Sequence, residues 1–172
     1  MTDKNIFWNA AGRAGLALGC VSIAYMVLGA LTPKIGSTGL TIAVSGLLWC
    51  LKFGGCIWLM LHFMKKFLAE NPEADTRGAF RLGAASALLS ALLFSAFYLA
   101  WSLFIQPDMF TEAFESVRSS SMMNAASLEM LDEMMPKMPA IGFFTNFFYC
   151  WIYGTVLSAI LSSSLKSRNP FE

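Results

Sequence analysis

The sequence predicts an all-α integral membrane protein, a four-helix bundle with two short amphipathic helices in the extracytoplasmic loop between the third and fourth spans. Two observations lead to this fold class. Hydrophobic residues make up 56% of the 172 residues and charged residues only 13%, whereas soluble domains carry about 25% charged residues. The apolar residues also gather in four runs, each near the length that a helix needs to cross a bilayer. Residues 1–172 are therefore expected to form a single transmembrane domain.

Each of the four apolar runs is expected to be a helix, because backbone groups in hydrocarbon must find their partners within the segment. Glycine, proline and charged residues separate the runs. The first run exceeds the usual core of a signal peptide, so it is interpreted as a retained span. The expected spans are residues 12–31, 40–63, 82–105 and 141–165, with an outer segment at 106–140.

The lysines and arginines predict the orientation of these spans. Eight of them flank the side that holds both termini and the second connection, and three flank the opposite side. The excess of basic residues marks the cytoplasmic side, so both termini are expected in the cytoplasm of a bacterial inner-membrane protein. A net charge of +1 gives no reason to expect nucleic acid as a partner.

Small residues recur at four-residue spacing within the spans, which places them on one face of a helix. Helices in lipid associate where small side chains let their backbones approach closely, so these positions are predicted contacts of the bundle. A homodimer face at the first-span glycines fits the same spacing. The principal packing residues are Gly15, Gly19, Gly83, Ala87, Gly154 and Ser158.

The outer segment shows the pattern of two amphipathic helices. Apolar residues from Met109 to Val117 fall on one helical face, and Ser127–Met135 repeats the pattern before Pro136. Seven of the eleven methionines lie here, which raises a copper(I) site as one alternative. An adaptable apolar surface against lipid or a partner is preferred, because the segment has no histidine or cysteine. No metal site and no cofactor are expected.

Several short motifs, in this order along the chain, resemble the bacterial membrane family catalogued as domain of unknown function 4199. They are "RGAFRLGAASALLSAL" from Arg77, "IQPDMFTEAFESV" from Ile105, and "YGTVLSAILSSSLKS" from Tyr153. The resemblance implies a four-span inner-membrane protein and supplies no catalytic residues. Genes of the family tend to lie near membrane glycosyltransferases, which implies an accessory role in envelope or polyprenyl-linked glycan assembly.

Lys52 is the most unusual residue, because it lies in the middle of the second apolar run. No Asp or Glu occurs within the expected spans. A charged residue inside a membrane span is costly, so it is first considered as a functional site. Three interpretations remain open. The ammonium is held by polar groups such as Asn146, or it binds an anionic group in a cavity. In the third interpretation it snorkels from near the end of a shifted or broken helix, with a break permitted by Gly54 and Gly55.

Two arginines before the third span, Arg77 and Arg81, lie four residues apart and share a helical face. They set the topology, and they are also candidates for contact with a phosphate or an acidic partner. Lys52 and Asn146 complete the candidate ligand or partner residues.

The preferred function is that of a non-enzymatic accessory or scaffold for a membrane partner, either a second copy or another membrane protein. The alternative is a binder or carrier of a small anionic or lipid-linked molecule, with Lys52 as its counter-charge. An enzyme is the least favoured, since no acid or histidine is expected at mid-membrane depth.

Overall fold

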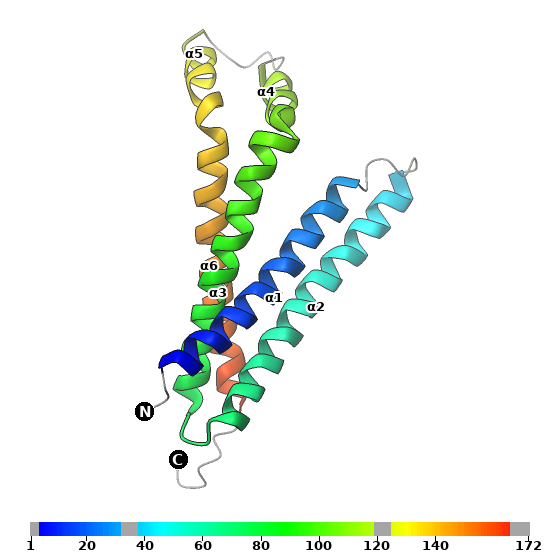
Figure 1. The fold of residues 1–172 in the computed structure, drawn as a ribbon. Helices are drawn as coiled ribbons and strands as arrows, with labels where there is room; N and C mark the ends of the chain where they lie inside the picture. The colour runs from blue at the N-terminus through cyan, green and yellow to red at the C-terminus, as the bar shows by residue number, and fades with distance from the viewer. Residues whose placement is uncertain (1–3, 32–37, 119–124, 166–172) are drawn as a thin grey trace.

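The computed structural model describes residues 4–31, 38–118 and 125–165, and within them every regular element is helical (Figure 1). The all-α class expected from the sequence is therefore confirmed. The α-helices are α1 (Lys4–Leu31), α2 (Thr38–Glu70), α3 (Thr76–Ala100), α4 (Thr111–Arg118), α5 (Ala125–Met134) and α6 (Met138–Ser164). A π-helical turn at Trp101–Ile105 extends α3, and short 3-10 turns precede α4 and α6.

Four helices in the described part of the chain are long and apolar enough to cross a membrane, as predicted. They are longer than the expected spans, since α1 begins at Lys4 and α2 continues to Glu70. Hydropathy marks only the part of a helix that matches hydrocarbon, whereas the helix itself continues until a capping residue or proline ends it.

The turn between α2 and α3 shows what ends a helix here. The Asn71 side-chain amide donates to the Phe67 carbonyl at 2.9 Å, which satisfies a carbonyl in the last turn of α2. Pro72 follows and cannot continue the helix. Asp75 then caps α3, because its carboxylate accepts from the Gly78 backbone N–H at 2.8 Å. The turn is therefore fixed by local hydrogen bonds.

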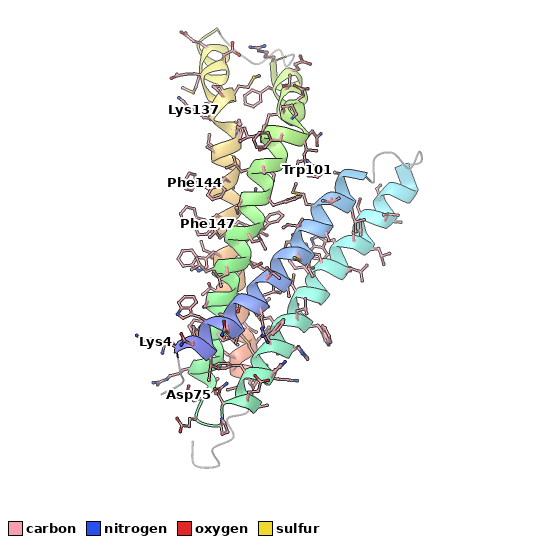
Figure 2. All side chains as sticks on the ribbon, in the orientation of Figure 1. Lys4, Asp75, Trp101, Lys137, Phe144 and Phe147 are labelled. Carbon is pink, nitrogen blue, oxygen red and sulfur yellow. The ribbon has the colours of Figure 1, made fainter. Side chains whose placement is uncertain are left out.

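The long helices form two antiparallel pairs, α1 with α2 and α3 with α6, that diverge along their length (Figure 1). They lie close together where α1 begins, α2 turns into α3 and α6 ends, which we call the termini end. At the opposite end, where α4 and α5 lie, the pairs are separated. Figure 2 places Lys4 and Asp75 at the termini end and Lys137 near the opposite end. The bundle is thus open at one end.

The distribution of small residues accounts for this opening. A Cβ on Gly15 would lie 2.7 Å from the Leu89 Cβ, and one on Gly19 would lie 2.6 Å from the Leu93 side chain. The next residues at this spacing on α1 are Ile23 and Val27, whose branched side chains hold helices apart. Close contact between α1 and α3 is therefore confined to the half near the termini end.

The contact between α3 and α6 follows a regular antiparallel register. A Cβ on Gly83 would lie 2.2 Å from the Ser158 Oγ, and one on Gly154 would lie 2.6 Å from the Ala87 Cβ. The Ser158 hydroxyl donates to the Phe80 carbonyl at 2.9 Å across the interface. Farther along, a Cβ on Gly142 would lie 2.6 Å from the Tyr98 ring. This seam holds the pair together up to the open end.

The outer segment contains the two short helices α4 and α5, which lie beyond the end of α3 and the start of α6 (Figure 1). An ion pair between Arg118 and Asp132 connects them. Phe114 of α4 is buried, whereas the side chains of Met109, Ala113, Val117, Leu128 and Leu131 lie outside the described residues.

Candidate functional site

Lys52 lies within an uninterrupted helix. At 1.5 Å per residue it is about 21 Å from Thr38 and about 27 Å from Glu70 along α2. Gly54 and Gly55 face open space, with no atom within 4 Å of an added Cβ, and the helix continues through them. The broken helix considered as one explanation of Lys52 is therefore wrong. The lysine stem, about 6 Å long, does not reach either end of α2.

Three aromatic rings from three helices surround the Lys52 ammonium. Its Nζ lies 4.7 Å from the centroid of the Tyr25 ring on α1. The Phe53 ring on α2 is at 5.9 Å and the Phe94 ring on α3 at 5.7 Å. All three distances fall within the range of cation–π attraction, which contributes about 0.5–1 kcal/mol per ring at exposed sites and about 2 kcal/mol when desolvated. The rings therefore offset much of the insertion cost of a charged lysine, about 2.5–3.5 kcal/mol.

The ammonium also borders a cavity of about 80 Å³ between the two helix pairs. This volume would hold about two or three waters, or one carboxylate or phosphate group. Its base, toward the termini end, is apolar and formed by Leu18, Met60 and Ala87. The cavity thus lies where the close contact of the pairs ends and their divergence begins.

The polar side chains around this cavity can all donate hydrogen bonds. All four long helices contribute a hydroxyl or the ammonium, and no lining residue is acidic. The thiols of Cys56 and Cys150 line the same space. The groups able to donate are Ser22, Lys52, Ser90, Tyr149 and Tyr153.

The aromatic rings next to the cavity are ordered by mutual contact. Phe53 packs edge-on against Tyr153 with centroids 5.6 Å apart, and Tyr153 stacks on Tyr149 at 6.3 Å. The centroid of the exposed Trp49 ring lies 4.4 Å from that of the Phe53 ring. These contacts connect α2 to α6 and restrict the Phe53 ring, one of the three that face the ammonium.

Electrostatically, the site is a cation with no anion near it in the four long helices. No Asp or Glu occurs in α1, α3 or α6, and Glu70 at the last residue of α2 lies about 27 Å away. Aromatic rings stabilise the ammonium through their quadrupoles but leave its net charge uncompensated. A cavity lined by donors and one cation can bind an anionic group, and its apolar surroundings can accept a hydrocarbon tail.

The other predicted site residues lie apart from this cavity. The Asn146 side-chain amide donates to the Gly142 carbonyl of its own helix at 2.8 Å, and it is not among the cavity residues. Arg77 and Arg81 are exposed in the first turns of α3, at the termini end. The candidate ligand or partner residues are therefore not brought together.

The predicted packing residues lie in the contacts already described, with Gly15 and Gly19 of α1 facing α3. Gly83 and Ala87 of α3 face Ser158 and Gly154 of α6. The first-span glycines thus form a helix contact within a single chain.

Sequence reasoning missed Tyr25 and Phe94, the two rings that other helices contribute to Lys52. Their signal is weak, because aromatic residues are common in spans and only the rotation of each helix decides which ones face a given point. Ser22, Ser90 and the cavity thiols of Cys56 and Cys150 were missed for the same reason. Among the described residues, no group of His, Cys, Asp and Glu side chains is arranged to hold a metal ion.

Comparison with protein families gives a match over most of the chain. A family model described as "Protein of unknown function (DUF4199)" matches residues 13–167, which covers most of the chain, including α2, α3, α6 and α1 from Arg13 onward. No curated protein and no solved structure matches the sequence.

Proposed function

The chain belongs to the DUF4199 family of proteins of unknown function, as its motifs predicted, and the family supplies no role. From the geometry of the site we propose that the chain is a non-enzymatic membrane protein that binds an amphipathic anion. The ligand is a molecule with one carboxylate or phosphate on an apolar body, such as a lipid-linked phosphate. The observation that carries the proposal is the cavity beside Lys52, where a cation and hydroxyl donors converge without an acidic residue.

The depth and size of the cavity define the ligand class. A space of about 80 Å³ admits a single anionic group, so the apolar body of the ligand lies outside the cavity. An opposite charge about 4 Å from the ammonium gains about 4 kcal/mol at an effective dielectric constant of 20. Part of this gain offsets the desolvation of the anion, which leaves a moderate affinity suited to reversible binding.

Binding is tested with three probes that share one chain: oleate, oleyl phosphate and oleyl alcohol. The purified protein in mild detergent should bind the two anions and be stabilised by them against thermal unfolding, whereas the alcohol should have little effect. Lys52→Met should weaken the binding of both anions about 10–100-fold, which corresponds to about 1.4–2.8 kcal/mol. Lys65→Met, on the exposed end of the same helix, is the matched control. Equal affinity of wild type and Lys52→Met for the anions would refute the proposal.

Insertion and orientation belong to the same proposal. The four apolar helices support a multi-pass protein, and the basic residues at the termini end support a cytoplasmic location for that end of a bacterial inner-membrane protein. Alkaline phosphatase fused after residue 165 should be inactive, and the same reporter within 119–124 should be active. The reverse pattern would contradict this orientation.

A scaffold for a membrane partner is the second candidate, favoured by the uncovered surfaces of α2 and α6. No residue in the most apolar 18-residue stretch of α2 is buried, and Trp49 and Trp58 are exposed there. On α6, Phe144 and Phe147 lie on the side away from α1 and α2 (Figure 2). A membrane glycosyltransferase is the partner implied by the family resemblance.

A photoreactive residue at position 58 tests this second role. It should capture the same protein partner, or a second copy, in repeated experiments in native membranes. The same residue at buried Ser102 should capture none. Adducts with lipid only at position 58 would contradict a scaffold role for this surface.

A further inference from the structure

A second cavity lies between the start of α1 and the end of α2, at the termini end. Its volume is about 200 Å³, larger than the cavity at Lys52. One face of each helix lines it at helical spacing, with residues 6, 9, 10 and 13 from α1 and residues 63, 66, 67 and 70 from α2. We call it the α1–α2 groove.

The groove combines an apolar base with two basic side chains from different helices. Phe67 is almost fully buried and is held by an edge-on contact with the Phe7 ring, with centroids 6.1 Å apart. Arg13 and Lys66 border the space together with the Asn9 amide. The one acidic residue, Glu70, pairs with Lys66 at 3.8 Å, and both are more than half exposed. The groove therefore carries a net positive charge.

The position of these charges relative to the membrane matters. Arg13 lies about 14 Å along α1 from Lys4, and Lys66 lies about 6 Å from the end of α2. Both cations are thus near the polar boundary of long apolar helices, at the depth where lipid phosphates lie. Ile6, Ala10 and Phe63 offer apolar surface next to them.

From this arrangement we propose that the α1–α2 groove binds the phosphate of an anionic phospholipid in the leaflet at the termini end. The Arg13 guanidinium and the Lys66 ammonium face the phosphodiester, the Asn9 amide donates to a headgroup oxygen, and the acyl chains follow the apolar surface of α1 and α2. The guanidinium group is opposite in charge to phosphate, and its planar N–H groups fit the phosphate oxygens. Glu70 pairs with Lys66 at this exposed position, so it competes with the phosphate for the Lys66 ammonium.

This site is independent of the proposed function at Lys52, since the two cavities share no lining residue. Binding in the groove differs from a general attraction of basic residues to acidic lipid, because only Arg13 and Lys66, among several cations at this end, hold the phosphate. Arg77, Arg81 and Lys65 are exposed at the same end but do not line the groove.

The test uses the full chain in mild detergent and native mass spectrometry with three probes: phosphatidylglycerol, phosphatidylethanolamine and free glycerol phosphate. Arg13→Gln and Lys66→Gln should each weaken phosphatidylglycerol binding about 5–10-fold. Lys65→Gln and Arg77→Gln, the matched controls, should change it less than twofold. Glu70→Gln should strengthen it, because it removes the competing carboxylate.

Each outcome decides the proposal. Tight binding of phosphatidylglycerol, with weaker binding of phosphatidylethanolamine and of glycerol phosphate, supports an anionic phospholipid site. Equal binding of phosphatidylethanolamine overturns the anionic preference, and equal binding of glycerol phosphate shows a site for soluble phosphate instead. Equal losses in the Lys65→Gln and Arg77→Gln controls would show diffuse attraction and overturn the site. The four lysine and arginine variants replace exposed residues, so unchanged thermal unfolding without lipid confirms that they are folded.

Discussion

The contact between α3 and α6 at Gly83 allows a quantitative prediction for Gly83→Ala. An added Cβ would lie 2.2 Å from the Met64 Cε and 2.2 Å from the Ser158 Oγ. Both of these atoms can move by rotation of a side chain. The Ser158 Cβ, at 2.9 Å, is fixed to the backbone, so α3 and α6 must separate to admit the methyl group.

The expected loss combines three contributions. Overpacking of a tight interface costs about 1–3 kcal/mol. Separation also weakens the hydrogen bond from Ser158 to the Phe80 carbonyl, and such bonds between membrane helices contribute about 0.6 kcal/mol on average. Replacing glycine by alanine within a helix stabilises the helix by about 1 kcal/mol, which offsets part of this loss. The net destabilisation should therefore be about 0.6–2.6 kcal/mol.

The assay is reversible unfolding in mixed micelles of mild detergent and SDS, followed by circular dichroism. Gly54→Ala is the matched control, because no atom lies within 4 Å of a Cβ added there and the helix propensity changes equally. That variant should be as stable as wild type or more stable. If Gly83→Ala proved no less stable than Gly54→Ala, the close α3–α6 seam would be wrong.

Two further predictions concern a helix cap and the rings around Lys52. Asp75→Ala removes the acceptor of the Gly78 N–H and should destabilise the protein by about 1 kcal/mol in the same unfolding assay; a change below about 0.3 kcal/mol would contradict the cap. Tyr25→Leu and Phe94→Leu each remove one ring from the Lys52 ammonium. In the absence of ligand each should lower stability by about 1 kcal/mol in wild type, and by clearly less in a Lys52→Met background, because only the wild type loses cation–π attraction. Equal losses in the two backgrounds would show that the rings stabilise the fold by packing alone.

Much of the fold could be predicted from the sequence because its signals are local. Apolar runs define four helices, and residues such as Gly83 and Ser158 mark the faces that can approach closely. The helix ends were predicted less accurately, because the capping role of Asp75 and the continuation of α1 to Lys4 do not depend on hydropathy.

The surroundings of Lys52 could not be predicted, because they depend on the rotation and crossing of helices that are distant in sequence. Asn146 was one of the polar groups considered for the ammonium. Its amide bonds to its own helix, and rings from α1 and α3 face the ammonium. The opening between the helix pairs is also a property of the whole assembly. It arises where the four-residue spacing of small residues on α1 ends at Gly19.

The central claim, that the Lys52 ammonium contacts the anionic group of a bound amphiphile, has a direct measurement. The measurement uses a Lys66→Gln protein labelled with ¹⁵N at lysine Nζ, so that the lysine of the α1–α2 groove does not contribute. With bound oleyl phosphate, its solid-state NMR spectra should show ¹⁵N–³¹P dipolar coupling for a separation within about 4 Å, the range of an ion pair. The coupling should disappear in Lys52→Met and persist in Lys65→Met. Bound oleyl phosphate without this coupling, or the same coupling in Lys52→Met, would contradict the assignment of Lys52 as the counter-charge.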